Sequence, residues 1–126
     1  MFPHPCGPRF AEAVAKGADP KAVVPDDYVI VRGGANPAAA PGETFSAAAG
    51  PSVEAAAAAL PHGQIRVTTA GAVRARGGVV EWIPEVSRHG TPNYQHVDVT
   101  EKGAMTLSEL QPNPVPRARR IDGDKK

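Results

Sequence analysis

The sequence predicts a small α+β domain, and three observations lead to that prediction. The stretches at 26–34 (DDYVIVRGG) and 95–100 (QHVDVT) carry closely spaced β-branched residues, which is typical of strands. The stretch at 51–60 is rich in alanine, begins after Gly-Pro and is followed by proline and glycine, which predicts a helix. The chain has 126 residues, enough for one hydrophobic core but not for two.

Composition excludes several classes of protein. Proline (14 residues) and glycine (13 residues) are frequent, so irregular loops should join short elements. The net charge of +1 gives no bulk attraction to nucleic acid or to anionic lipid. Cys6 is the only cysteine, so no internal disulfide is expected, and no Cys/His spacing predicts a metal site.

The sequence also bears on location. It contains no apolar run of about 18 residues, which argues against a membrane span. The N-terminus lacks the basic and apolar regions of a signal peptide. We therefore expect a cytoplasmic protein in the producing cell, and secretion into a target cell would need a specialised system.

The first elements are predicted from the spacing of apolar residues and from the glycines that end each element. Residues 1–25 are expected to form an arm with one short helix at Arg9–Lys16, which Gly17 ends. A strand is predicted at Tyr28–Arg32, and Gly33-Gly34 would end it and let another backbone or a ligand come close. A period of two places three of its side chains on one face: Tyr28, Ile30 and Arg32.

The middle of the chain adds two strands and two helices. A short edge strand is expected at 43–47, before the alanine-rich helix at 51–60. A second strand is predicted at Gln64–Thr68, with Gln64, Arg66 and Thr68 on one face. Thr68 or Thr69 can cap a helix that runs through Arg76 and is closed by Gly77-Gly78.

The remaining elements are short. Strands are predicted at Val79–Ile83 and Tyr94–Thr100, with a polar loop at 85–92 between them. In the second of these, Val97 and Val99 face one way and Tyr94, His96 and Asp98 the other. The run Thr106–Glu109 matches a capping box and predicts one helical turn. The main domain is expected at 26–116, followed by a charged flexible tail at 117–126.

Two residues are candidates for chemistry, and each has a structural alternative. The chain has no phosphate-binding loop, nucleophile elbow, zinc-protease motif or dinucleotide fingerprint. Arg32 ends an apolar strand, so its partner is either an anionic ligand or an acid such as Asp26, Glu43 or Asp98. His96 lies mid-strand and is either a structural or a catalytic histidine.

Taken together, these features resemble a known family. They are a strand that ends in Arg-Gly, an alanine-rich helix, the block VTTAGAVRARGGVVEWIPE and a late strand with QHVDV. In this order they resemble the small ADP-ribosyltransferase-like toxins of type VI secretion and polymorphic toxin systems. The resemblance covers about Tyr28 to Pro116. It implies a compact split β-sheet with short helices that clasps NAD+.

The resemblance also implies a site. The family carries an arginine on the first strand, a Ser/Thr-containing strand, and a late-strand catalytic residue that is commonly glutamate. In this sequence Arg32, Thr68 and His96 match these positions as catalytic candidates. The histidine in the glutamate's place departs from the wider family and leaves transferase activity in question. The NAD+-binding candidates are Arg32, Gly33, Gln64, Thr69 and Tyr28.

The implied function is an antibacterial toxin that acts on NAD+ by ADP-ribosyl transfer or by NAD+ hydrolysis. Its partners would be a cognate immunity protein and a secretion apparatus, and the free protein is expected to be a monomer without a bound metal. If this holds, Arg32, Thr68 and His96 should line one concave surface. The alternative is a non-catalytic interaction protein on the same small fold, with Arg32 in a structural salt bridge and His96 inert.

Overall fold

The computed structural model describes residues 8–34, 42–58, 60, 63–83, 85–86, 92–93, 95–102 and 106–116. The helices are α1 (Pro8–Ala15), α2 (Val53–Ala57) and α3 (Ala70–Ala75). The strands are β1 (Val29–Gly33), β2 (Thr44–Gly50), β3 (Gln64–Thr69), β4 (Val79–Trp82), β5 (Glu85–Val86), β6 (Pro92–Asn93), β7 (His96–Thr100) and β8 (Gln111–Pro112). Cys6, most of the loop after Gly34 and the charged tail lie outside the described residues, so the expectations for them stay predictions.

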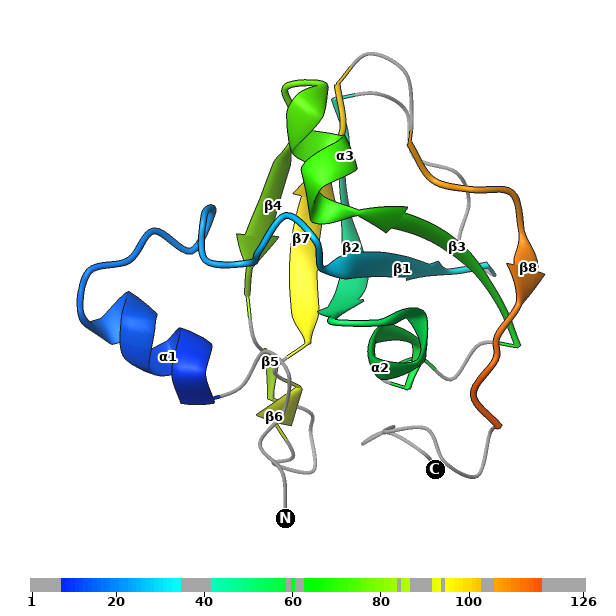
Figure 1. The fold of residues 1–126 in the computed structure, drawn as a ribbon, viewed down its shortest axis with the longest axis horizontal. Helices are drawn as coiled ribbons and strands as arrows, with labels where there is room; N and C mark the ends of the chain where they lie inside the picture. Colours follow the sequence, from blue (N-terminus) through cyan, green and yellow to red (C-terminus); the bar gives the residue numbers. More distant parts are fainter. Residues whose placement is uncertain are drawn as a thin grey trace.

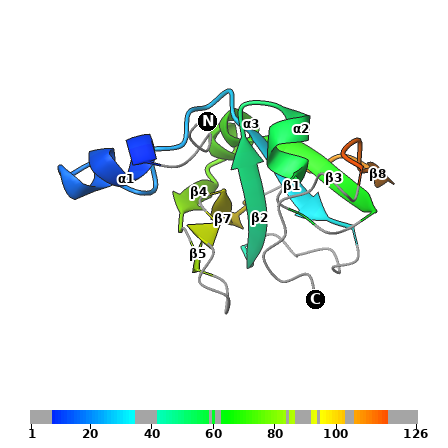
Figure 2. The same cartoon turned by 90° about the horizontal axis from the view of Figure 1, so that it is seen from below.

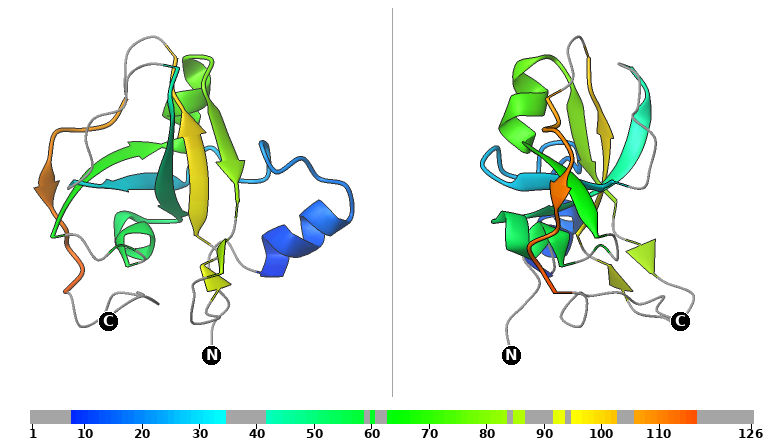
Figure 3. Two further views of the ribbon diagram at one scale, coloured as in Figure 1. Left: turned by 180° about the vertical axis from the view of Figure 1, so that it is seen from behind. Right: turned by 90° about the vertical axis from the view of Figure 1, so that its right-hand side faces the viewer.

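One antiparallel sheet organises the fold and confirms the α+β class. Its strand order is β4-β7-β2-β1-β3-β8, and β5 and β6 form a separate two-stranded ribbon. β1 and β3 cross β2, β7 and β4 at a steep angle, so the sheet is strongly twisted (Figure 1). From behind, β2, β7 and β4 are seen side by side (Figure 3).

The sheet has two faces, which we name by the helix that packs on each. β1 passes between α3 and α2 (Figure 1). The α3 face carries Ile30, Phe45, Val80 and Val97 among its strand residues, packed with Ala70 and Val73 of α3. The α2 face carries Val31 and Ile65, packed with Ala56 and Ala57 of α2.

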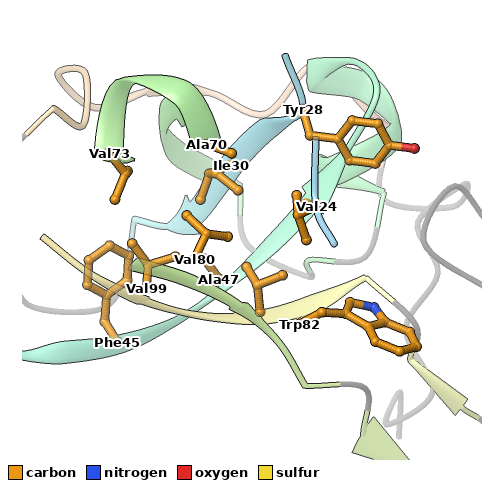
Figure 4. Close-up of a cluster of buried hydrophobic side chains, with 12 residues drawn as sticks. Val24, Tyr28, Ile30, Phe45, Ala47, Ala70, Val73, Val80, Trp82 and Val99 are labelled. Carbon is orange, nitrogen blue, oxygen red and sulfur yellow. The ribbon is translucent and has the colours of Figure 1, made fainter. Parts of the chain in front are cut away.

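The larger core lies on the α3 face (Figure 4). Its aromatic residues Tyr28, Phe45 and Trp82 are 5–8% exposed, which makes all three core side chains. Because successive residues of a strand point to opposite faces, the alternation of β7 decides what else reaches this core. Val97 and Val99 point into it, as the sequence predicts.

Both packed helices are capped by a side chain, and the sequence predicts the cap of the second one. Ser52 Oγ accepts a hydrogen bond from Ala55 N and begins α2, which is shorter than the expected helix at 51–60. Thr69 Oγ1 accepts from Ala72 N at 3.1 Å and begins α3. Gly77 follows α3 with a φ of 84°, a conformation that favours glycine.

The segment before β1 is part of the packed domain. Val24 is fully buried in the α3-face core, although the sequence assigns residues 1–25 to an arm. Arg74 holds this segment, because its Nη1 donates to Val24 O at 2.6 Å and to Asp26 Oδ1 at 2.7 Å. α1 lies to one side of the sheet, beyond β4 (Figure 2).

Three further sequence expectations about local structure are wrong. The expected polar loop at 85–92 begins with β5 and ends at the start of β6, and these two strands pair with each other. β2 is a central strand rather than an edge strand, because β7 and β1 pair with it on both sides. The capping box at 106–109 does not form a helix. Ser108 instead binds Val67 through both its backbone N–H and its hydroxyl, at 2.8 and 3.0 Å.

Residues 106–112 therefore continue along the outer side of β3. Gln111 and Pro112 of β8 pair with Ile65 and Gln64. The edge of β3 offers backbone partners that an isolated helical turn could not replace. Within the described residues, no helix is long and apolar enough to cross a membrane.

Candidate functional site

Arg32 lies on the α3 face, as its strand phase predicts. Its side chain is buried (9% exposed), and its guanidinium carbon lies 4.5 Å from the centre of the Phe45 ring. Arg32 Nη1 donates to the carbonyl oxygen of Ser46 at 3.4 Å. Burial lowers the pKa of Arg32 below its usual value, because a buried guanidinium loses solvation.

Thr68 lies on the same face, directly opposite Ile30 in the register of β1 and β3. Its hydroxyl donates to Thr106 Oγ1 at 2.6 Å. Thr106 in turn donates to Glu101 Oε1 from both its hydroxyl, at 2.7 Å, and its backbone N–H, at 2.8 Å. A chain of hydrogen bonds thus joins Thr68 to a carboxylate.

Glu101 is the residue that the sequence analysis missed. It directly follows β7 and is in phase with Val97 and Val99, so it continues the α3-face side of that strand. The signal in the sequence is the spacing of two in VDVTE, which extends past the predicted end of the strand.

The environment of Glu101 is unusual for a carboxylate. The residue is 1% exposed, and only Oε1 is hydrogen-bonded. Glu101 Oε2 is buried and has no hydrogen-bond partner among the described residues. An acceptor left unsatisfied in this way costs free energy, typically about 1–3 kcal/mol and more for a charged group. Such a group is a candidate for binding a donor that a ligand supplies.

His96 is on the other face of the sheet. It pairs with Ala48 of β2 and alternates with Val97, so its side chain projects from the α2 face. Arg32 and His96 therefore point to opposite faces, and the expectation that Arg32, Thr68 and His96 line one surface is wrong. Alternation within a strand predicts which residues share a face of that strand. It does not predict which faces of two different strands lie on the same side of the sheet.

Contacts at both ring nitrogens hold the His96 side chain in one orientation. Nδ1 lies 2.6 Å from Ile83 O, and because a carbonyl oxygen only accepts, Nδ1–H is the donor. Nε2 lies 3.7 Å from Asp98 Oδ1. In the register of β4 and β7, Glu81 is directly opposite Asp98, so a second acid lies on this face next to Asp98. No described group of three or more His, Cys, Asp or Glu side chains could hold a metal ion.

The NAD+-binding candidates do not gather in one place. Tyr28 is buried in the α3-face core, and Gln64 is exposed on the same face at the start of β3. Thr69 points to the opposite face from Thr68, and its hydroxyl accepts the hydrogen bond from Ala72 N that caps α3. Gly33 is opposite Ile65, on the α2 face.

The expected close approach of a backbone occurs at Gly34. Its N–H donates to Gln64 O at 2.7 Å, and a Cβ at this position would lie 2.8 Å from that oxygen. The second glycine of the pair is thus required by contact between β1 and β3. A ligand is not needed to explain it.

Comparison of the chain with protein-family models, with curated proteins and with solved structures found no match. Function is therefore inferred from the described residues and from the resemblance of the sequence to the toxin family.

Proposed function

We propose that this protein is an ADP-ribosyltransferase-like toxin that acts on NAD+, by ADP-ribosyl transfer or by NAD+ hydrolysis. The observation that carries the proposal is the shared face of Arg32, Thr68 and Glu101. Glu101 supplies the late glutamate of the family pattern, and His96 is left out of the site. The steep crossing of β1 and β3 over the other strands supports the split sheet that the resemblance implies (Figure 1).

Each residue has a role that its chemistry allows. Arg32 binds the pyrophosphate of NAD+, since a guanidinium can make two parallel hydrogen bonds to it. Glu101 accepts a hydrogen bond from a hydroxyl of the nicotinamide ribose and stabilises the positive charge that develops on that ribose as nicotinamide leaves. Thr106, itself bound to Thr68, fixes the orientation of the carboxylate. Because Glu101 is 1% exposed, the side chains over it must move when NAD+ binds.

The alternative is a non-catalytic interaction protein, and one observation favours it. Arg32 is buried, stacks on Phe45 and binds the carbonyl oxygen of Ser46. Those contacts are also the ones that a structural arginine makes. Under this alternative, the Thr68–Thr106–Glu101 chain serves only to hold residues 106–112 against β3.

The resemblance to the toxin family also implies two partners for this protein. An immunity protein would block the site in the producing cell, where the free toxin is a cytoplasmic monomer. A secretion apparatus would deliver it to a competing bacterium. These partners stay predictions.

The first experiment is expression of the chain in a bacterial host while intracellular NAD+ is measured. It is done with and without co-expression of the gene next to its own, where an immunity protein would be encoded. The proposal predicts that NAD+ falls when the chain is expressed alone and recovers when an immunity protein is co-expressed. Unchanged NAD+ and unchanged growth in both arms would favour the interaction protein.

A further inference from the structure

Residues 106–112, which we call the edge segment, connect the outer side of β3 to Glu101. The segment runs along β3 and ends in β8 (Figure 1). At its first residue, Thr106 donates to Glu101 Oε1 from its backbone N–H at 2.8 Å and from its hydroxyl at 2.7 Å. The next residue, Leu107, packs against the α3-face core. The start of the edge segment therefore helps to bury a carboxylate that is 1% exposed.

The edge segment is held less firmly than the central strands. None of its residues is buried, and Leu110 is 40% exposed. Its hydrogen bonds to β3 include the short pairing of β8, two bonds between Ser108 and Val67, and the bond from Thr68 to Thr106. In contrast, four of the five residues of β1 are buried. An element with few buried apolar residues and exposed hydrogen bonds opens at a lower free energy than the core does.

The chain is anchored on both sides of the edge segment. After it, Asn113 N donates to Gly63 O at 2.9 Å, and Val115 is buried in the α2-face core. Before it, Glu101 directly follows β7, whose valines are fully buried. An opening of the edge segment can therefore end at these anchors and leave the other strands paired.

The closed edge segment leaves one polar atom unsatisfied. Glu101 Oε2 is buried and has no hydrogen-bond partner among the described residues. A buried acceptor without a donor costs free energy. When the edge segment opens, water or a ligand can donate to Oε2 and the cost is removed. The buried carboxylate thus favours the open state relative to the closed one.

We propose that the edge segment is a lid over Glu101. It opens while the rest of the sheet stays paired, which lets a small molecule reach the carboxylate. Its closure over the ligand restores the two hydrogen bonds from Thr106 that orient the carboxylate, as lids in enzymes complete a site. The choice of NAD+ as the ligand rests on the proposed function, whereas the opening itself does not depend on it.

The first part of the test is hydrogen exchange of the full chain without ligand. The amides of Thr106 and Ser108 should exchange by opening of the edge segment, faster than the amides of β1 and β2. Ser108→Ala removes the hydroxyl that accepts from Val67 N and should speed up exchange in the edge segment about two- to tenfold, the equivalent of one hydrogen bond.

The matched control is Val80→Ala. Val80 is fully buried in β4, at the opposite end of the strand order from β8. Loss of its methyl groups should speed up exchange in β1 and β2 at least about tenfold, because those amides exchange by global unfolding. Exchange in the edge segment should stay at the wild-type rate, since β4 is intact in both the closed and the open state.

The second part of the test measures access to Glu101. The wild type and both variants are treated with a water-soluble carbodiimide and an amine, and modification of each carboxyl group is followed by mass spectrometry. The rate at Glu101 should rise in Ser108→Ala by the same factor as exchange in the edge segment, and should not change in Val80→Ala. Glu109 is exposed and should react at one rate in all three proteins.

The outcomes separate the lid from the proposed function. Edge-segment amides and a Glu101 carboxyl that react only at the rate of global unfolding, and faster in Val80→Ala, overturn the lid. Nicotinamide release from NAD+ by the wild type tests the proposed function independently. A protein whose edge segment opens but that releases no nicotinamide supports the lid and contradicts the NAD+ proposal. A protein that releases nicotinamide although Glu101 reacts only on global unfolding overturns the lid and leaves the proposed function standing.

Discussion

The side chains of Thr68 and Glu101 are joined by a single hydroxyl, that of Thr106. This hydroxyl accepts from Thr68 at 2.6 Å and donates to Glu101 at 2.7 Å. In the sheet, β1 and β2 lie between β3, which carries Thr68, and β7, which Glu101 follows. Flat strands with that spacing would be about 14 Å apart. Twist of the sheet therefore brings the ends of the α3 face together around a buried carboxylate.

Removal of that hydroxyl should destabilise the fold. Thr106→Val keeps the shape of the side chain but leaves Thr68 without its acceptor and Glu101 with one donor fewer. We expect the free energy of unfolding to fall by about 1–3 kcal/mol, measured by urea denaturation. Thr44→Val is the control, because Thr44 and Thr100 form a similar 2.7 Å hydrogen bond that is exposed. It should cost at most about 0.5 kcal/mol. Equal losses in the two variants would contradict a special role for the buried chain.

Arg74 should contribute more to the stability of the fold than Asp26, the acid with which it pairs. Its guanidinium donates to the backbone oxygens of Val24 and Lys21 as well as to Asp26. The Asp26 side chain is 76% exposed, so the ion pair itself should contribute about 1 kcal/mol or less. We expect Arg74→Ala to lower the free energy of unfolding by more than Asp26→Ala does. Hydrogen exchange should also speed up in the segment before β1. An Asp26→Ala variant that is as unstable as Arg74→Ala would show that the ion pair is the main contact.

Most of the strands could be predicted from the sequence because their faces are chemically distinct. The valines of β7 alternate with polar residues, as in a half-buried strand, and β1 is a short β-branched run that ends at Gly33-Gly34. The start of α3 could also be predicted, because a threonine before Ala-Gly-Ala favours a helix cap, although the sequence leaves Thr68 and Thr69 as alternatives and the structure uses Thr69.

The remaining features depend on pairing between distant segments, which local pattern does not reveal. The capping box at 106–109 has the right residues for a helix start. Ser108 instead forms hydrogen bonds with Val67 at the edge of β3. The site differs from the expected one for the same reason. Alternation gave the side of each strand on which Arg32 and His96 lie, but only the pairing of β1, β2 and β7 shows that those sides are opposite.

Loss of the His96 ring should leave activity on NAD+ intact. The ring lies on the α2 face, away from Arg32, and contacts Ile83 and Asp98. His96→Ala should lower the free energy of unfolding by about 1 kcal/mol, the typical net value of one hydrogen bond. Nicotinamide release from NAD+ should stay at the wild-type rate. A folded His96→Ala variant without activity would return the histidine to the site.

Arg32 should be more important for binding than for stability. Arg32→Met keeps an apolar side chain of similar length over Phe45, and it removes both the cost of burying the guanidinium and its long hydrogen bond to Ser46 O. We expect the unfolding temperature without ligand to change little. Millimolar NAD+ should raise that temperature for the wild type but much less for Arg32→Met. Wild type with no response to NAD+, together with a strongly destabilised Arg32→Met, would identify a structural arginine and favour the interaction protein.

The most direct test of the account is nicotinamide release from NAD+ by purified wild type and Glu101→Gln, each with bacterial lysate as a source of acceptors. Both ADP-ribosyl transfer and hydrolysis break the bond between ribose and nicotinamide, so the readout covers both reactions. Glutamine keeps an oxygen for Thr106 and removes the charge, and the fold of the variant can be checked by its circular dichroism. The account predicts release by the wild type and at least about a hundredfold less by Glu101→Gln, the scale for loss of one electrostatic stabiliser. No release by the wild type, or equal release by a folded Glu101→Gln, would contradict it.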